Sequence, residues 1–228
     1  MEAVFERITN KPLRGRIAEK IQQAIFSGDL KEGQRLVERH LADQFATSLT
    51  SVREALIELE RDGFVTKKPN SATYVTKFSH ETAEKNFAFR RVLEGYAIEQ
   101  ACLWATTDDI EQMEKVYLEL VDAARQHDNQ LFIRTDFLLH QTFWRMAHND
   151  YVVEALRKAL IPYFAFSAIR LMSRERFDLL QDAASHLPII EAIRSKNPEL
   201  ARRAFLVALE GWKADPKTFL GEEVEHRE

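Results

Sequence analysis

The sequence predicts a mainly α-helical protein in two parts. The first is a winged helix-turn-helix of three helices and a β-hairpin, and the second is an all-helical bundle. Apolar residues recur at helical spacing along most of the chain, and strand-like runs are confined to a short stretch near residues 64–76. This change of secondary-structure class near residue 78 divides the chain into expected domains of residues 10–77 and 78–220.

The N-terminal part combines helical and strand patterns. Its expected helices cover residues 13–26, 38–45 and 50–62, and its expected strands cover residues 64–66 and 73–76. Gly28 and Gly63 follow the first and third helices, as glycine commonly does at helix C-termini. Pro69, Asn70 and Ser71 separate the two strands and predict the tip of the wing.

The C-terminal part shows helical periodicity throughout. Its expected helices cover residues 82–105, 108–125, 131–147, 151–172, about 185–196, and 198–214. Pro162 falls inside the fourth of them, where we expect a kink. Pro188 indicates that the fifth starts close to Ser185, and Pro198 suits the first turn of the last.

The third predicted helix carries the most informative pattern. It opens with Thr50, Ser51 and Arg53, two hydroxyl groups and a cation, and its apolar stripe includes Leu56 and Leu59. In a helix-turn-helix, the second helix presents its N-terminal side chains to base edges in the major groove. The residues through 77 are slightly basic and the rest of the chain is acidic, which suits a DNA-reading head on a body that does not touch DNA. We therefore expect binding to double-stranded DNA.

The bulk composition narrows the class of protein. The formal net charge is −4, and no apolar run approaches the roughly 20 residues that a membrane helix needs. The N-terminal residues lack the apolar core of a signal peptide. The single cysteine, Cys102, excludes an internal disulfide, and we expect it to be a buried small residue. These features predict a cytoplasmic protein with no membrane partner.

Ionisable residues interrupt the predicted apolar faces of the bundle. Asp136 and His140 lie one helical turn apart, His186 precedes an apolar stretch, and Arg90 shares a helix face with Glu94. Buried ionisable groups are unfavourable unless they are paired or bind a metal. The other histidines are expected at the surface or in turns: His40, His80, His127, His148 and His226.

Three interpretations of these residues are open. Asp136, His140 and His186 suit a site for zinc, nickel or manganese, with further positions for a carboxylate effector. Alternatively, the same residues bind an organic acid directly, with Arg90 holding its carboxylate and Glu94 as a second effector-site residue. In the third interpretation the cluster is purely structural and Arg90 only pairs with Glu94.

The head resembles the N-terminal domain of the GntR superfamily of bacterial transcription regulators, in the runs GRIAEKIQQAIFSGDLKEGQRLVERHLADQF and SVREALIELERDGFV. The rest resembles the FCD-type ligand-binding domain of its FadR subfamily. This second resemblance rests on Arg90-Arg91-Val92-Leu93-Glu94, Asp136-Phe137-Leu138-Leu139-His140, Asn149, and His186 followed by Ala192 and Ala201. Together they cover about residues 10–214.

For DNA recognition, the resemblance implies contacts from the second and third helices. The expected DNA-binding residues are Arg39, Ser48, Thr50, Ser51, Arg53 and, in the wing tip, Asn70. Alternatively, Arg53 pairs only with a surface carboxylate. Relatives usually have an arginine where this chain has Leu49 and a glycine in the wing tip. Losing one cationic contact alters base preference or weakens binding by about 1–3 kcal/mol per half-site, so no relative's operator can be assumed.

For the body, the resemblance assigns Asp136, His140 and His186 to metal-ligand positions. It also implies a fourth ligand, a histidine on the last helix, but Ala208 occupies that position. A divalent metal is therefore expected to have three protein ligands at most.

These inferences predict a homodimeric, metabolite-responsive regulator, with repression as the expected mode. Each head would read half of a short inverted repeat, and the body would bind a small organic acid. Two rivals follow from the same residues. One is a metal-dependent hydrolase with Glu94 or Asp182 as general base, which we do not favour, and the other is a regulator with a vestigial effector pocket.

Overall fold

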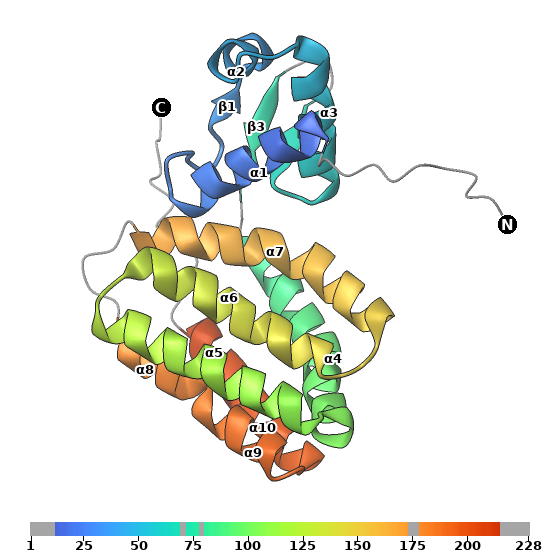
Figure 1. Ribbon diagram of the computed structural model, residues 1–228, viewed down its shortest axis with the longest axis vertical. Coiled ribbons are helices and arrows are strands. Elements are labelled where there is room, and N and C mark those ends of the chain that lie inside the picture. The colour runs from blue at the N-terminus through green and yellow to red at the C-terminus, as the bar shows by residue number, and fades with distance from the viewer. Residues whose placement is uncertain (1–11, 69–71, 78–79, 173–177, 215–228) are drawn as a thin grey trace, which may run out of the picture.

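The computed structural model describes residues 12–68, 72–77, 80–172 and 178–214, which form a small head and a larger helical body (Figure 1). The head contains α1 (Leu13–Phe26), β1 (Arg35–Leu36), α2 (Glu38–Gln44), α3 (Leu49–Arg61), β2 (Val65–Lys67) and β3 (Thr73–Val75). The body contains α4 (His80–Trp104), α5 (Thr107–Arg125), α6 (Asn129–Arg145), α7 (Asp150–Met172), α8 (Leu179–Ser185), α9 (Leu187–Arg194) and α10 (Pro198–Ala214). The predicted fold class is confirmed.

The head folds around an apolar core shared by its helices and the wing. α1 buries Ile17, Ile21 and Ile25 at the helical spacing visible in the sequence. α3 packs on α1 and buries its own stripe, including Leu56 and Leu59. Because these apolar faces turn inward, the polar start of α3 remains at the surface.

The wing contains one more strand than predicted. β2 and β3 pair as the expected antiparallel hairpin, with Val65 opposite Val75. β1 pairs with the other edge of β3 and gives the strand order β1-β3-β2. β1 has only two residues, Arg35 and Leu36, so no alternating pattern marked it in the sequence. Residues 69–71 at the wing tip, including Asn70, lie outside the described residues.

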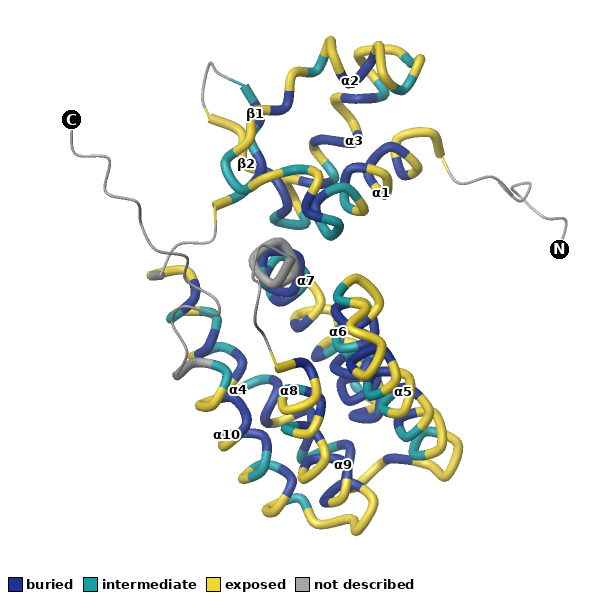
Figure 2. The backbone as a smooth tube through the Cα atoms, turned by 90° about the vertical axis from the view of Figure 1, so that its left-hand side faces the viewer, coloured by how far each residue is buried: buried dark blue, intermediate teal, exposed yellow. Residues whose placement is uncertain are grey.

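The body is a bundle whose helices bury the sides that face one another (Figure 2). α5 packs along α6, α6 packs on α7, and α10 packs on α4 and α9. α5 begins one residue earlier than predicted, because Thr106 and Asp109 cap it reciprocally through side chain and backbone. α7 continues through Pro162 to Met172.

One short helix of the body was not predicted. The helix expected at about residues 185–196 is α9, with ends within two residues of those expected, but α8 (Leu179–Ser185) precedes it and only His186 separates the two. Pro188 accounts for the break, since proline lacks the N–H that would continue α8 and suits the first turn of α9. His186 therefore lies at the junction of two short helices.

The head packs on the body through α1 and α7. Gly63, which follows α3, lies against Pro162 of α7. Its φ is +80°, and a Cβ added there would lie 2.8 Å from Pro162 Cγ. Glycine is therefore required at position 63 both for its backbone conformation and for the space between the two parts.

Two expectations from composition can be compared with the structure. Cys102 is buried as expected, with its Sγ 3.8 Å from the carbonyl oxygen of Ala192, and burial raises the pKa of its thiol to about 11. In the part of the chain that the structure describes, no helix has both the length and the apolar character to cross a bilayer.

We expect Gly63→Ala to lower the free energy of unfolding by about 1–2 kcal/mol, because alanine is strained at a positive φ and its Cβ would press on Pro162. Gly211→Ala is the matched control, since an added Cβ there meets nothing within 4 Å and alanine favours the helix by roughly 0.5–1 kcal/mol. Denaturant titration measures both. Equal stability changes in the two variants would contradict the close approach at Gly63.

Candidate functional site

The polar start of α3 lies next to α2, at the end of the head away from the body (Figure 1). Ser48 caps the helix, and its Oγ accepts a hydrogen bond from the Ser51 N–H at 3.1 Å. Leu49 and Thr50 form the exposed first turn. Hydroxyl groups and N–H groups at a helix start are suited to phosphate. The predicted residues of α3 are thus gathered on one accessible helix end.

Arg53 projects from the same helix end, with 60% of its side chain exposed. Its Nε donates a hydrogen bond to Glu38 Oε2 on α2 at 2.6 Å. Arg53 therefore does pair with a surface carboxylate in the free protein. Such exposed pairs contribute about 0–1 kcal/mol, so Arg53 can exchange Glu38 for DNA at little cost. Arg39 is exposed on α2, and Asn70 lies outside the described residues.

A second group of ionisable side chains is enclosed in the body. Arg90 and Glu94 on α4 are 1% and 0% exposed, His140 on α6 is 2% exposed, and His186 between α8 and α9 is 1% exposed. Asp136, one turn before His140, is 17% exposed. Five residues selected from three separate stretches of sequence therefore lie together.

Glu94 is the centre of this cluster. Its Oε2 accepts a hydrogen bond from Arg90 Nε at 2.6 Å, and its Oε1 accepts from His140 Nδ1 at 2.7 Å and Trp144 Nε1 at 2.9 Å. Burial by itself raises the pKa of the Glu94 carboxyl, but the Arg90 guanidinium and His140 outweigh it and hold the pKa at about 2. The ionised Glu94 carboxylate thus accepts hydrogen bonds from Arg90, His140 and Trp144 and holds these three side chains in place.

The two imidazoles are oriented through their Nδ1 atoms. His140 Nδ1–H donates to Glu94, and His186 Nδ1 lies 3.2 Å from the carbonyl oxygen of Asp182, to which it donates. Both Nε2 atoms then carry lone pairs, and they lie only 3.3 Å apart. Burial lowers the pKa of both imidazoles, that of His186 to about 3, so the rings are neutral at pH 7.

The acceptor atoms of three side chains converge at this point. Asp136 Oδ1 is 3.3 Å from His186 Nε2, and one ligand atom each from Asp136, His140 and His186 lies within 4.8 Å of the others. Among the described residues, Asp136 Oδ1 has no hydrogen-bond partner. Lone pairs that face one another need a proton or a cation between them. A divalent metal satisfies all three atoms, and the contact from Glu94 to His140 is typical around metal-bound imidazoles. The residues therefore fit a divalent metal.

A proton is the alternative occupant of the same space. Burial raises the pKa of Asp136 well above its usual value, and the nearby Asp182 carboxylate raises it further. A protonated Asp136 can donate a hydrogen bond to His186 Nε2 without any metal. A purely structural cluster, in which a proton on Asp136 takes the place of a metal, therefore also satisfies these atoms. Metal analysis distinguishes the metal-bound cluster from the protonated one.

The last helix presents a tryptophan to the cluster. Ala208 is 8% exposed on α10, where the resemblance implied a fourth ligand. One turn later, the Trp212 ring centroid lies 5.4 Å from that of His140 and 5.1 Å from that of His186. We did not single out Trp212 from the sequence, although its spacing of four from Ala208 placed it on the same face.

Arg90 lies among aromatic rings, with its guanidinium carbon 5.0 Å from the ring centroid of Tyr163, 5.6 Å from that of Phe164 and 5.1 Å from that of Trp212. Its Nε donates to Glu94, but its buried Nη2 has no hydrogen-bond partner among the described residues. An unsatisfied buried donor is unfavourable. The arrangement therefore leaves one position where an incoming carboxylate would gain a hydrogen bond.

The fold defines a class of protein in which a DNA-binding winged helix-turn-helix head is joined to a helical body that encloses a polar cluster. Residues 13–75 match the family described as bacterial regulatory proteins, gntR family, and residues 86–211 match the FCD domain. The chain belongs to the GntR family of regulators, in the group with an FCD domain. It is a DNA-binding transcription regulator, and the predicted family is confirmed.

Relatives of known name agree with this family. The chain is 26% identical over 204 residues to the "Probable D-xylose utilization operon transcriptional repressor" of Paenarthrobacter nicotinovorans, covering 90% of this chain and 88% of that protein. It is 29% identical to the "Uxu operon regulator" of Haemophilus influenzae, covering 92% and 83%. Among solved structures, "E. coli McbR/YncC" shares the fold, with a TM-score of 0.79 and 20% identity over 90% of this chain and 97% of that one.

The hydrolase alternative is not supported. The family and the named relatives are transcription regulators. Glu94, one of the two residues considered as a general base, has a pKa of about 2 and is engaged by three donors, so it is a poor proton acceptor near neutral pH. Burial raises the pKa of Asp182 to about 7, but this alone does not define an active site.

We expect Glu94→Gln to lower the free energy of unfolding by about 3 kcal/mol, because it leaves the Arg90 charge buried without its anion. Glu81→Gln, on the same helix, is the matched control. Glu81 also pairs with a basic residue four positions away, Lys85, but both side chains are exposed, so a change below about 0.5 kcal/mol is expected. Denaturant titration of both variants provides the measurement, and a Glu94→Gln protein as stable as the control would contradict the central role of this ion pair.

Proposed function

We propose that the protein is a cytoplasmic, homodimeric repressor that leaves its operator when a small organic acid binds in the body. A divalent metal held by Asp136, His140 and His186 would take part in holding the acid. The observation that carries this proposal is the convergence of three acceptor atoms in a cluster that also contains the unsatisfied Nη2 of Arg90.

The head supplies the DNA contacts in this proposal. Each head reads one half of an inverted repeat, and two heads in a dimer double the number of phosphate contacts. The exposure of the α3 N-terminus supports this assignment. The proposed contacts are Arg39, Ser48, Thr50, Ser51, Arg53 and, from sequence alone, Asn70.

The body supplies the sensing site. Three protein ligands leave coordination positions for water or for the oxygens of an effector, and Ala208 adds no further ligand. Zinc, nickel and manganese all accept this donor set. Glu94 acts here as a positioning residue that holds His140 and Arg90, rather than as a direct effector contact.

A carboxylate is the effector group that this chemistry favours. The carboxylate would bind the metal, or the position between Asp136, His140 and His186 if no metal is present, and accept a hydrogen bond from Arg90 Nη2. The aromatic rings around Arg90 would contact the rest of a small effector molecule. One relative's name refers to D-xylose utilization, which supports testing sugar-derived acids first. If effector and operator favour different arrangements of the heads, each must weaken the other's binding by the same factor.

We expect Arg53→Ala to weaken binding to the DNA upstream of the protein's own gene at least tenfold, since each lost contact costs roughly 1–3 kcal/mol per half-site. Glu38→Gln should tighten binding, because it frees Arg53 and removes a negative charge from the DNA-facing surface. Gel-shift titrations at one fixed salt concentration measure these changes.

The matched control for Arg53 is Arg61→Ala. Arg61 is an exposed arginine at the other end of α3, paired with Asp62. Its substitution should leave the affinity for the operator within about twofold, because it removes no proposed DNA contact. Equal losses in Arg53→Ala and Arg61→Ala would show that only overall charge matters and would refute the assignment of α3 as the recognition helix.

Metal analysis of the purified protein should find a stoichiometric divalent ion that Asp136→Ala and His140→Ala lose. His148→Ala, which removes an exposed histidine bonded to Asp109, should keep it. Ala208→His should slow loss of the ion to a chelator, because it adds a ligand at the fourth position. Wild-type protein that stays metal-free after loading would exclude the metal and leave direct acid binding or a structural cluster.

Thermal unfolding with a panel of sugar acids, hydroxy acids and dicarboxylates identifies the effector. An acid at 100 times its dissociation constant should add about 2.7 kcal/mol to the free energy of unfolding. Arg90→Lys should abolish the effect, because lysine keeps the charge but lacks the planar fork. No stabilisation by any acid, with or without added metal, would favour the vestigial pocket.

A further inference from the structure

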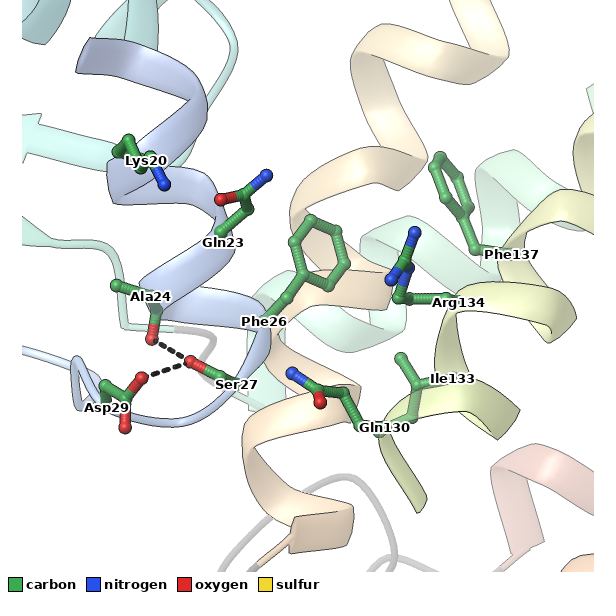
Figure 3. Close-up of a pocket in the computed structure, with 10 residues that line it drawn as sticks. All are labelled: Lys20, Gln23, Ala24, Phe26, Ser27, Asp29, Gln130, Ile133, Arg134 and Phe137. Carbon is green, nitrogen blue, oxygen red and sulfur yellow. Dashed lines mark hydrogen bonds between the residues drawn. The ribbon is translucent and has the colours of Figure 1, made fainter. Parts of the chain in front are cut away.

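A second pocket lies between the head and the body, outside the buried cluster. It has a volume of about 720 Å³, within the range of small-molecule sites, and it opens between α1 and α6 (Figure 3). Its opposing walls are formed by Lys20, Gln23 and Phe26 of α1 and by Gln130, Arg134 and Phe137 of α6.

Two aromatic rings give the pocket firm apolar surfaces. Phe26 packs edge-on against Phe64 in the head core, with ring centroids 6.1 Å apart. Phe137 packs against Phe164 at 5.0 Å and Trp144 at 6.1 Å in the body. Each ring is therefore held by its own part of the protein, while the space between them is left for another molecule.

The pocket also carries an excess of positive charge. Lys20 comes from the head and Arg134 from the body, and among the residues that the structure describes no carboxylate pairs with either. The one acidic group in the lining, Asp29, accepts a hydrogen bond from Ser27 Oγ at 2.5 Å (Figure 3). Gln23 and Gln130 add uncharged hydrogen-bonding groups. These groups favour an anion.

We propose that this pocket is a second ligand site, for an organic anion that also has an apolar group. The anionic group of the ligand lies near Lys20 and Arg134, and its apolar group lies between Phe26 and Phe137. This proposal does not depend on a metal or an effector in the buried cluster.

The position of the pocket gives such a ligand a consequence for DNA binding. α2 and the start of α3 lie at the far end of the head (Figure 1), so the ligand does not cover the proposed DNA contacts. It touches both parts of the protein and therefore favours the head–body arrangement described here over others. α6 also carries Asp136 and His140, which links the pocket wall to the buried cluster.

Fluorescence titration of the full chain with the probe 1-anilinonaphthalene-8-sulfonate, an aromatic anion, tests the proposal. Saturable binding is expected, and Arg134→Gln and Lys20→Gln should each weaken it about tenfold, the loss typical of one charge-assisted hydrogen bond. Asp29→Asn should tighten binding, because it removes the one negative charge in the lining. Arg203→Gln, an exposed arginine on α10 away from the pocket, should change nothing.

Thermal melts of the same variants show that their fold is intact, which is expected because all four side chains are exposed. Absence of saturable binding, or equal affinity in wild type, Arg134→Gln and Lys20→Gln, would overturn the proposal. So would a loss of affinity in His140→Ala without a loss in the pocket variants, since the probe would then occupy the bundle. None of these results bears on operator binding, so the repressor proposal would stand or fall separately.

Discussion

The buried ion pair between Arg90 and Glu94 is the constraint on which the rest of the body depends. Two charges inside an apolar bundle are tolerated only when each is matched, and Glu94 matches several groups at once. Through His140 and Trp144 it ties α4 to α6, and the orientation that it gives His140 directs the ring toward His186. The helices around the cluster are therefore positioned by polar contacts as well as by apolar packing.

The helices of the body that face the head are α6 and α7. α7 receives the head at the contact between Gly63 and Pro162, and α6 lines the pocket below α1. The same helix carries Asp136 and His140. A rearrangement of the cluster therefore has a short physical route to the head, through helices that already touch it. Because the link is a packed contact and not only a covalent connection, a shift of α7 would change how the head is held.

Structural features that depend on local residue patterns could be predicted from the sequence. The apolar stripes and helix ends defined most helices, and polar residues on apolar faces identified the cluster. Features that depend on distant pairing were missed. The two-residue strand β1 exists only through its contact with β3. The seven-residue helix α8, which packs on α5, was also not expected, whereas Pro188 was correctly interpreted as a helix start. Trp212 and the partners of Glu94 depend on how helices far apart in sequence pack, and the pairing of Arg53 with Glu38 joins two helices across a turn.

The tryptophans give the molecule an optical property of its own. The chain has three. Trp144 donates its indole N–H to Glu94. The Trp212 ring meets the His140 ring edge-on and is tilted against the His186 ring, whereas Trp104 is 60% exposed at the end of α4. Trp144 is buried and Trp212 is half-buried, so emission from these two indoles is sensitive to changes in the cluster, while an aqueous quencher reaches the exposed Trp104 most readily. Changes in the cluster can thus be followed in unlabelled protein, at the wavelengths of its own aromatic residues.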